Sequence, residues 1–197
     1  MADQKETDLA STQRLTPVAA QEDSPQFTSE QQRIEEMIAA DTPLHDILAE
    51  LVLMIEAQSP EMICSILLVS DDGNHVRHAV GPSLPENYLK VIDGSPIGPK
   101  QGSCGTAMFR GEPVIVTDIA TDPLWDEYRN FAWAINVAAC WSTPIMSSKG
   151  KVLGSFAMYY REPRGPKPEE QRLTDVATKL ASRAIERSVA RSAQQSR

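Results

Sequence analysis

Hydrophobic residues in the first third of the chain recur at helical spacing. From Phe27 onward, apolar positions return every three to four residues, and the pattern resumes across residues 44–58 after an interruption at Asp41, Thr42 and Pro43. Such an apolar stripe is typical of a helix that packs on a sheet. We therefore expect two helices, with Thr42 as the N-cap of the second and Pro43 at its first position.

Shorter runs farther along the chain have the composition of β-strands. Residues 61–80 place apolar, β-rich segments on both sides of a polar turn at 71–74, which predicts a hairpin. Residues 113–118 predict a single strand. Residues 138–148 and 152–162 flank a turn at Lys149 and Gly150, which predicts a second hairpin.

Further helices are predicted between and after these strands. Two short helices are expected, across residues 83–94 and across residues 103–111, where Gly111 ends the second. Asp122 is the predicted N-cap of a later helical segment, with Pro123 at its first position. A long helix is expected from Glu169 to Val189, with one apolar side formed by Leu173, Val176, Ala177, Leu180, Ala184 and Ile185.

This order of elements predicts the fold class and the domain limits. Hairpins without regular strand-helix-strand alternation indicate an α+β domain with an antiparallel sheet and disfavour a parallel nucleotide-binding fold. A chain of 197 residues suits one domain. Residues 1–26 are rich in Gln, Ser, Thr, Asp and Glu and are expected to form a disordered tail. The domain with its flanking helices is then expected at 27–190, and a C-terminal tail at 191–197.

Composition narrows the classes of partner and site. The net charge of -8 argues against a nucleic-acid partner, because phosphate contacts need clustered Lys and Arg. No run approaches the roughly 18 apolar residues of a membrane span, and the N-terminus lacks a secretory signal, so we expect no membrane partner and a cytoplasmic location. Cys64, Cys104 and Cys140 lack zinc-site spacing, and His75 and His78 are expected on opposite faces of a strand. Reduced thiols and no metal site are therefore expected.

Three segments together resemble a known family. The segments "GSCGTAMFRGEPVIVTDIATDPLW", "ACWSTPI" and "GKVLGSFAMYYREPR", followed by a closing helix, are similar to the GAF domains of bacterial sensory proteins. The resemblance covers about residues 30–190. It implies a central antiparallel sheet of five or six strands, with helices on both faces and a ligand pocket on one of them.

The resemblance also implies a function and partners. GAF domains of this type are sensors of small molecules or of redox state, and their flanking helices commonly pair subunits and pass the signal on. We therefore expect an unidentified small-molecule ligand, a homodimer through the terminal helices and a signalling output protein. No histidine-kinase, cyclase or phosphodiesterase signature is present in the chain. The cyclic-nucleotide and bilin signatures of other GAF domains are also missing, so the sequence names no cofactor.

Cys104 and Cys140 are the candidates for thiol chemistry. Ser103 is expected to cap a helix starting at Cys104, where the free N–H groups and the helix dipole would stabilise a thiolate. Alternatively, the thiol is buried and inert, as is common for free cysteine. Cys104 matches a cysteine of the free methionine-R-sulfoxide reductases, a GAF branch, but that branch's other cysteines have no counterpart here. A thiol reductase using Cys104, with Cys140 as resolving partner, is the alternative to a non-catalytic sensor.

The segment after the third predicted strand carries much of the aromatic content of the chain. Trp125, Tyr128 and Trp133, with Trp141 from the following strand, are expected to line a pocket for an apolar or planar ligand. Alternatively, they form a plug in a structural assembly module that binds no ligand. Trp141 and Cys140 are strand neighbours and must face opposite sides of the sheet. The polar contacts to a ligand are expected from Thr106, Asp118, Ser142 and Thr143.

Overall fold

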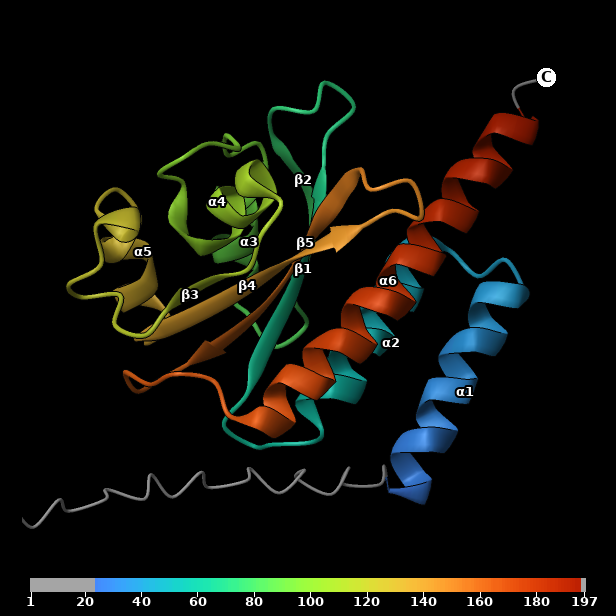
Figure 1. Cartoon of the computed structure of the whole chain (residues 1–197), viewed down its shortest axis with the longest axis horizontal. Helices are drawn as coiled ribbons and strands as arrows, with labels where there is room; N and C mark the ends of the chain where they lie inside the picture. Colours follow the sequence, from blue (N-terminus) through green and yellow to red (C-terminus); the bar gives the residue numbers. More distant parts are fainter. Residues whose placement is uncertain (1–23, 196–197) are drawn as a thin grey trace, which may run out of the picture.

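The computed structural model describes residues 24–195, with the side chains at positions 78 and 79 excepted (Figure 1). Helices α1 (Pro25–Ala39) and α2 (Leu44–Glu56) come first, followed by the hairpin of β1 (Ile63–Val69) and β2 (Val76–Val80). Next come α3 (Glu86–Ile92), α4 (Gly102–Arg110), β3 (Val114–Val116), the short 3-10 helix η1 (Pro123–Trp125) and α5 (Arg129–Ala134). Strands β4 (Ala139–Met146) and β5 (Val152–Tyr160) and helix α6 (Pro168–Gln195) complete the described chain.

The five strands form one antiparallel sheet in the order β2-β1-β5-β4-β3. The two predicted hairpins are confirmed, and β5 from the second pairs with β1 from the first, with Phe156 opposite Ile66. Figure 1 shows α2 and α6 against one face of this sheet and α3, α4 and α5 on the other. The predicted α+β class and the antiparallel sheet are therefore confirmed.

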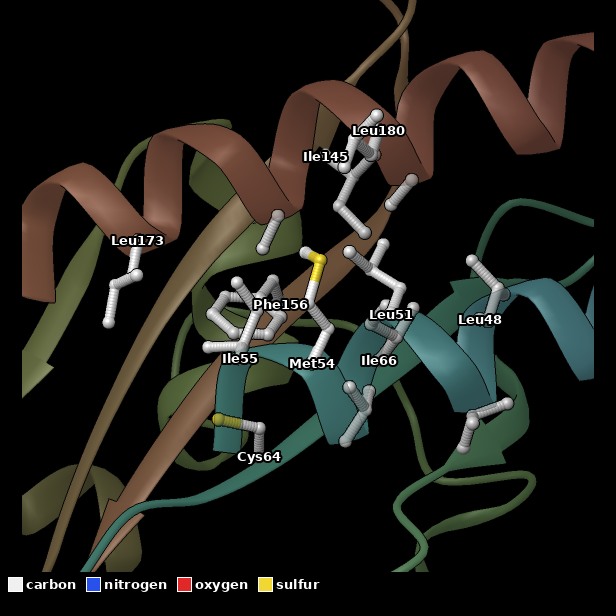
Figure 2. Close-up of a cluster of buried hydrophobic side chains, with 14 of the residues drawn as sticks. Leu48, Leu51, Met54, Ile55, Cys64, Ile66, Ile145, Phe156, Leu173 and Leu180 are labelled. Atoms are coloured by element: carbon white, nitrogen blue, oxygen red, sulfur yellow. The ribbon is translucent and has the colours of Figure 1, made fainter. Parts of the chain in front are cut away.

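The face of the sheet that packs on α2 and α6 carries the larger hydrophobic core. Figure 2 shows Leu51 and Ile55 of α2 beside Ile66 and Phe156 of the sheet, under the side chains of α6. The apolar side of α6 lies in this core, including Leu173, Ala177, Leu180, Ala184 and Ile185. The apolar stripe of α6 is therefore covered by the chain's own α2 and sheet.

Several predicted boundaries are corrected by the structure. Pro43 itself occupies the N-cap position of α2, and the helix has no side-chain cap, so the expected role of Thr42 is wrong. Helix α1 begins at Pro25, inside the predicted tail, and residues 1–23 lie outside the described chain. Helix α6 continues to Gln195, so residues 191–195 are helical rather than part of a tail. The predicted cap of the later helical segment is correct, because Asp122 accepts from the Leu124 N–H at 2.8 Å.

A buried polar cluster joins the sheet to the start of α6. Glu170 accepts two hydrogen bonds from the Arg164 guanidinium, at 2.9 and 3.1 Å, and one from the Tyr160 hydroxyl at 2.7 Å. The guanidinium also lies over the rings of Tyr160 and Trp141, 4.2 and 5.0 Å from their centroids. We call these four residues the Glu170 cluster. It fixes the first turn of α6 to the ends of β4 and β5.

Candidate functional site

A cavity lies between the second face of the sheet and the layer of α3, α4, η1 and α5. Its empty space, with the open mouth included, is about 520 Å³. The lining consists of aliphatic, aromatic and neutral polar residues: Leu67, Val76, Tyr88, Val91, Ile92, Ser95, Pro96, Gln101, Gly102, Ser103, Cys104, Gly105, Trp125, Tyr128, Phe131 and Tyr159.

The first turn of α4 forms the floor of this cavity. Gly102 opens the helix with a φ of +58°, a left-handed value that favours glycine. A side chain at this position would also meet the Trp125 ring at 3.8 Å and Tyr128 at 3.9 Å. The helix therefore starts with a glycine, and the buried Ser103 and Cys104 follow directly against the sheet.

Ser103 ties three elements together instead of capping the helix. Its hydroxyl donates to the Cys140 carbonyl in β4 at 3.0 Å and accepts from the Trp125 indole N–H at 3.0 Å. Helix α4 begins one residue before Ser103, with Gln101 as the N-cap residue and no side-chain cap. The expectation that Ser103 caps a helix starting at Cys104 is therefore wrong. The hydroxyl positions the aromatic wall of the cavity relative to the sheet.

Cys104 and Cys140 approach the same hydroxyl group. The Cys104 sulfur lies 3.0 Å from Ser142 Oγ and 3.8 Å from the Tyr159 hydroxyl, and the Cys140 sulfur lies 3.8 Å from Ser142 Oγ. Hydrogen bonds from the Cys140 thiol, Ser142 and Tyr159 outweigh burial and lower the pKa of Cys104 to about 7. Burial raises the pKa of Cys140 and of Cys64. Of the three thiols, Cys104 is the one set up to ionise near neutral pH.

This electrostatic difference gives a prediction for thiol reactivity. A thiol with a lowered pKa is a thiolate at a lower pH, so alkylation of Cys104 by iodoacetamide should rise through about pH 7, two units below the ordinary 9.0. Cys64 and Cys140 should stay unmodified in the folded protein across this range, because burial keeps them protonated. Peptide mass spectrometry over a pH series measures all three sites. A Cys104 profile centred near pH 9 would contradict the expected stabilisation, and Ser142→Ala should shift the profile upward.

A second hydrogen-bonded link crosses the mouth of the cavity. The Tyr128 hydroxyl donates to Gln101 Oε1, which connects the segment before α5 to the segment before α4. The Gln101 N–H in turn donates to Thr106 Oγ1 at 3.0 Å. Thr106 is fully buried and orders the start of α4, and it does not line the cavity. Among the predicted ligand contacts, Cys104, Trp125 and Tyr128 are therefore the three that meet at the cavity.

The other predicted contacts lie elsewhere. Trp141 packs on Tyr160 on the opposite face, because strand neighbours alternate and Cys140 occupies the cavity face. Trp133 is 58% exposed on α5 and does not line the cavity. Asp118 accepts from the Ala120 N–H and the Thr121 hydroxyl and closes the turn after β3. Ser142 is buried, does not line the cavity and contacts Cys104, which does. Thr143 is half-buried and lies on the same face of β4 as the buried Trp141.

Several lining residues were not predicted from the sequence. Tyr159 could have been found, because it pairs with Cys140 across β4 and β5 and shares that residue's face of the sheet. Its hydroxyl also lies 3.0 Å from Ser65 Oγ of β1. Tyr88 and Val91 come from a seven-residue helix whose direction is set by the fold, and Gln101 comes from a loop. For these three residues the sequence carries no equivalent signal.

The sequence and the fold both identify the family. The family model for the GAF domain matches residues 41–186, about three quarters of the chain, and this chain belongs to the GAF domain family. The GAF domain of a phosphoenolpyruvate-protein phosphotransferase from Coxiella burnetii is similar, with a TM-score of 0.67 at 20% identity over 85% of this chain and 96% of that chain. The free methionine-R-sulfoxide reductase from Neisseria meningitidis, solved with its substrate, has a TM-score of 0.64 at 16% identity over 83% of this chain and 90% of that chain.

One curated relative is named as a sensor. The methyl sulfide methyltransferase-associated sensor of Methanosarcina acetivorans is 34% identical over 172 residues, which is 87% of this chain. The chain spans only 17% of the length of that relative. No helix between residues 24 and 195 is both long and apolar enough to cross a membrane. In the same range, no group of three or more His, Cys, Asp or Glu side chains is placed to hold a metal ion.

Proposed function

We propose that this chain is a sensory GAF domain that binds a small molecule in the cavity between the sheet and α3, α4 and α5. The observation that carries the proposal is the cavity itself, because three predicted ligand contacts from separate segments meet around it. Val91 and Phe131 line it and are 45% and 41% exposed. A bound molecule would cover these apolar side chains, which otherwise face water at a cost.

The signal would leave the cavity through the sheet and reach α6. Tyr159 faces the cavity, and the next residue, Tyr160, belongs to the Glu170 cluster on the other face. A ligand that moves the end of β5 would therefore act on the first turn of α6 through one short hydrogen-bonded path. Helix α6 would present this change to an output domain or partner protein. A cytoplasmic location is part of the same proposal.

A ligand-dependent thermal shift tests the binding. With the small-molecule fraction of an extract of the source cells, the wild-type melting temperature should rise by roughly 5 to 10 °C, the effect of a ligand at about 100 times its dissociation constant. Val91→Trp should abolish the rise, since an indole at this exposed position on α3 fills the mouth of the cavity. Val189→Trp, at a 61% exposed position on α6, is the matched control. An unchanged melting temperature in all three proteins would favour the ligand-free structural module.

A thiol reductase is the second candidate. The observation in its favour is that Cys104 and Cys140 both approach the Ser142 hydroxyl, so the two thiols lie side by side. Turnover of free methionine sulfoxide with a thioredoxin system, lost in Cys104→Ser, would establish this activity. The absence of turnover in the wild-type protein would exclude it.

The proposed homodimer through the terminal helices needs a surface other than the apolar stripe of α6. The apolar stripe of α6 is buried within the chain, and ion pairs of Arg183 with Glu35 of α1 and of Arg187 with Asp41 in the following turn hold this segment to α6. A dimer would therefore use the outer sides of α1 and α6. Light scattering at micromolar concentration distinguishes a dimer from a monomer.

A further inference from the structure

The walls of the cavity carry no basic side chain and no carboxylate among the described residues. Aromatic rings come from β5, η1, α3 and α5, and aliphatic side chains come from β1, β2 and α3. None of the sixteen lining residues that the structure describes is Lys, Arg, His, Asp or Glu, and Cys104, whose thiol pKa is lowered, is the lining residue that can become negatively charged near neutral pH. A buried ionic group is strongly destabilised unless an opposite charge or several hydrogen bonds compensate it. These residues supply no positive charge that could compensate an anionic ligand.

The polar groups of the lining are largely occupied by one another. Ser103 bonds to the Cys140 carbonyl and to Trp125, and Ser95 donates to the Val91 carbonyl at 3.2 Å. The hydroxyls of Tyr128 and Tyr159 are engaged with Gln101 and Ser65. A ligand therefore meets few unused hydrogen-bonding groups in this cavity.

Gln101 supplies a donor that these pairs do not use. Its side-chain oxygen accepts from Tyr128, and its backbone N–H donates to Thr106, but its Nε2 amide group makes no hydrogen bond within residues 24–195. This amide belongs to a half-buried residue of the lining. It can donate to one carbonyl, ether or hydroxyl oxygen of a bound molecule.

From this geometry we propose that the ligand is an uncharged, mainly apolar ring compound with one acceptor oxygen facing Gln101. This inference rests on the proposed function, because it names the chemical class that the same cavity selects. It excludes metabolites with anionic groups, such as nucleotides and free amino acids, as ligands. Stacking on Trp125 and Phe131 supplies the favourable contact area, and Gln101 supplies orientation.

A pair of probes that differ only in charge tests this inference. Naphthalene-2-carboxamide and naphthalene-2-carboxylate have the same ring system, and both offer an acceptor oxygen. Isothermal titration at pH 7 should show the amide binding on the order of 100-fold more tightly, because the carboxylate must be desolvated without a counter-charge. Val91→Trp should remove binding of the amide, and Val189→Trp should leave it unchanged. Gln101→Ala should weaken binding of the amide several-fold.

The outcomes separate this inference from the proposed function. Equal or tighter binding of the carboxylate overturns the ligand class and leaves a small-molecule sensor in place. If neither probe binds but the cell extract raises the melting temperature, the proposed ligand class alone is overturned. Failure of both probes and of the extract overturns the class and the proposed function together.

Discussion

Replacing Glu170 with alanine is expected to lower the free energy of unfolding by about 3 to 5 kcal/mol, the usual effect of removing one partner from a buried ion pair. Glu170 is 5% exposed and accepts from Arg164, Tyr160 and the Lys167 N–H. Its removal leaves the Arg164 guanidinium and the Tyr160 hydroxyl without their acceptor, at a site that is largely shielded from water. The first turn of α6 would then lose its attachment to β4 and β5.

Urea unfolding of matched variants measures this effect. Glu169→Ala is the control, because Glu169 occupies the same helical turn and is exposed, so its loss should change stability by less than about 0.5 kcal/mol. Glu170→Gln should fall between the two, since an amide keeps an acceptor oxygen but loses the charge. Equal stability of Glu170→Ala and Glu169→Ala would show that the cluster does not secure α6.

Replacing Gly154 with alanine is the second change with a large expected effect. A Cβ atom at this position would lie 2.2 Å from the Leu67 carbonyl oxygen on β1, a backbone atom that cannot move aside alone. Because β1 and β5 pair at the centre of the sheet, the two strands would have to separate and disturb both layers. We expect a loss of about 3 kcal/mol or more in the free energy of unfolding.

A second glycine provides the control for this prediction. Gly150 lies in the β4–β5 turn with a φ of +76°, and a Cβ there would meet no atom within 4 Å. Gly150→Ala should therefore cost only about 1 kcal/mol, from backbone strain alone. Similar unfolding midpoints for the two variants would mean that the β1–β5 contact is looser than the structure shows.

The sequence predicted those features of the structure that depend on residues close together in the chain. Period-two alternation placed Cys140 and Trp141 on opposite faces, and a turn composition at Lys149 and Gly150 identified a hairpin. Helix α4, whose first turn lines the cavity, was predicted with its end at Gly111, because a glycine that ends a helix in the left-handed conformation is a local signal. Each of these predictions depends on residues that are close together in the sequence.

The arrangement of the site depends on contacts between distant segments. Cys104 and Ser142 are 38 residues apart and Ser65 and Tyr159 are 94 apart, so no local pattern brings their side chains together. The sequence could not show whether Trp133 points toward the cavity or toward solvent, because α5 has only six residues and its orientation is set by the elements it packs on. The sequence therefore predicted which helices and strands surround the cavity better than it predicted which side chains line it.

Native mass spectrometry tests most directly whether the cavity binds a small molecule. Wild-type protein incubated with the small-molecule fraction of the source cells should show an added mass that leaves on activation. The added mass should persist in Val189→Trp and be missing in Val91→Trp, which fills the mouth of the cavity. The bare protein mass in the wild type, or an added mass retained in Val91→Trp, would contradict a ligand site between the sheet and α3, α4 and α5.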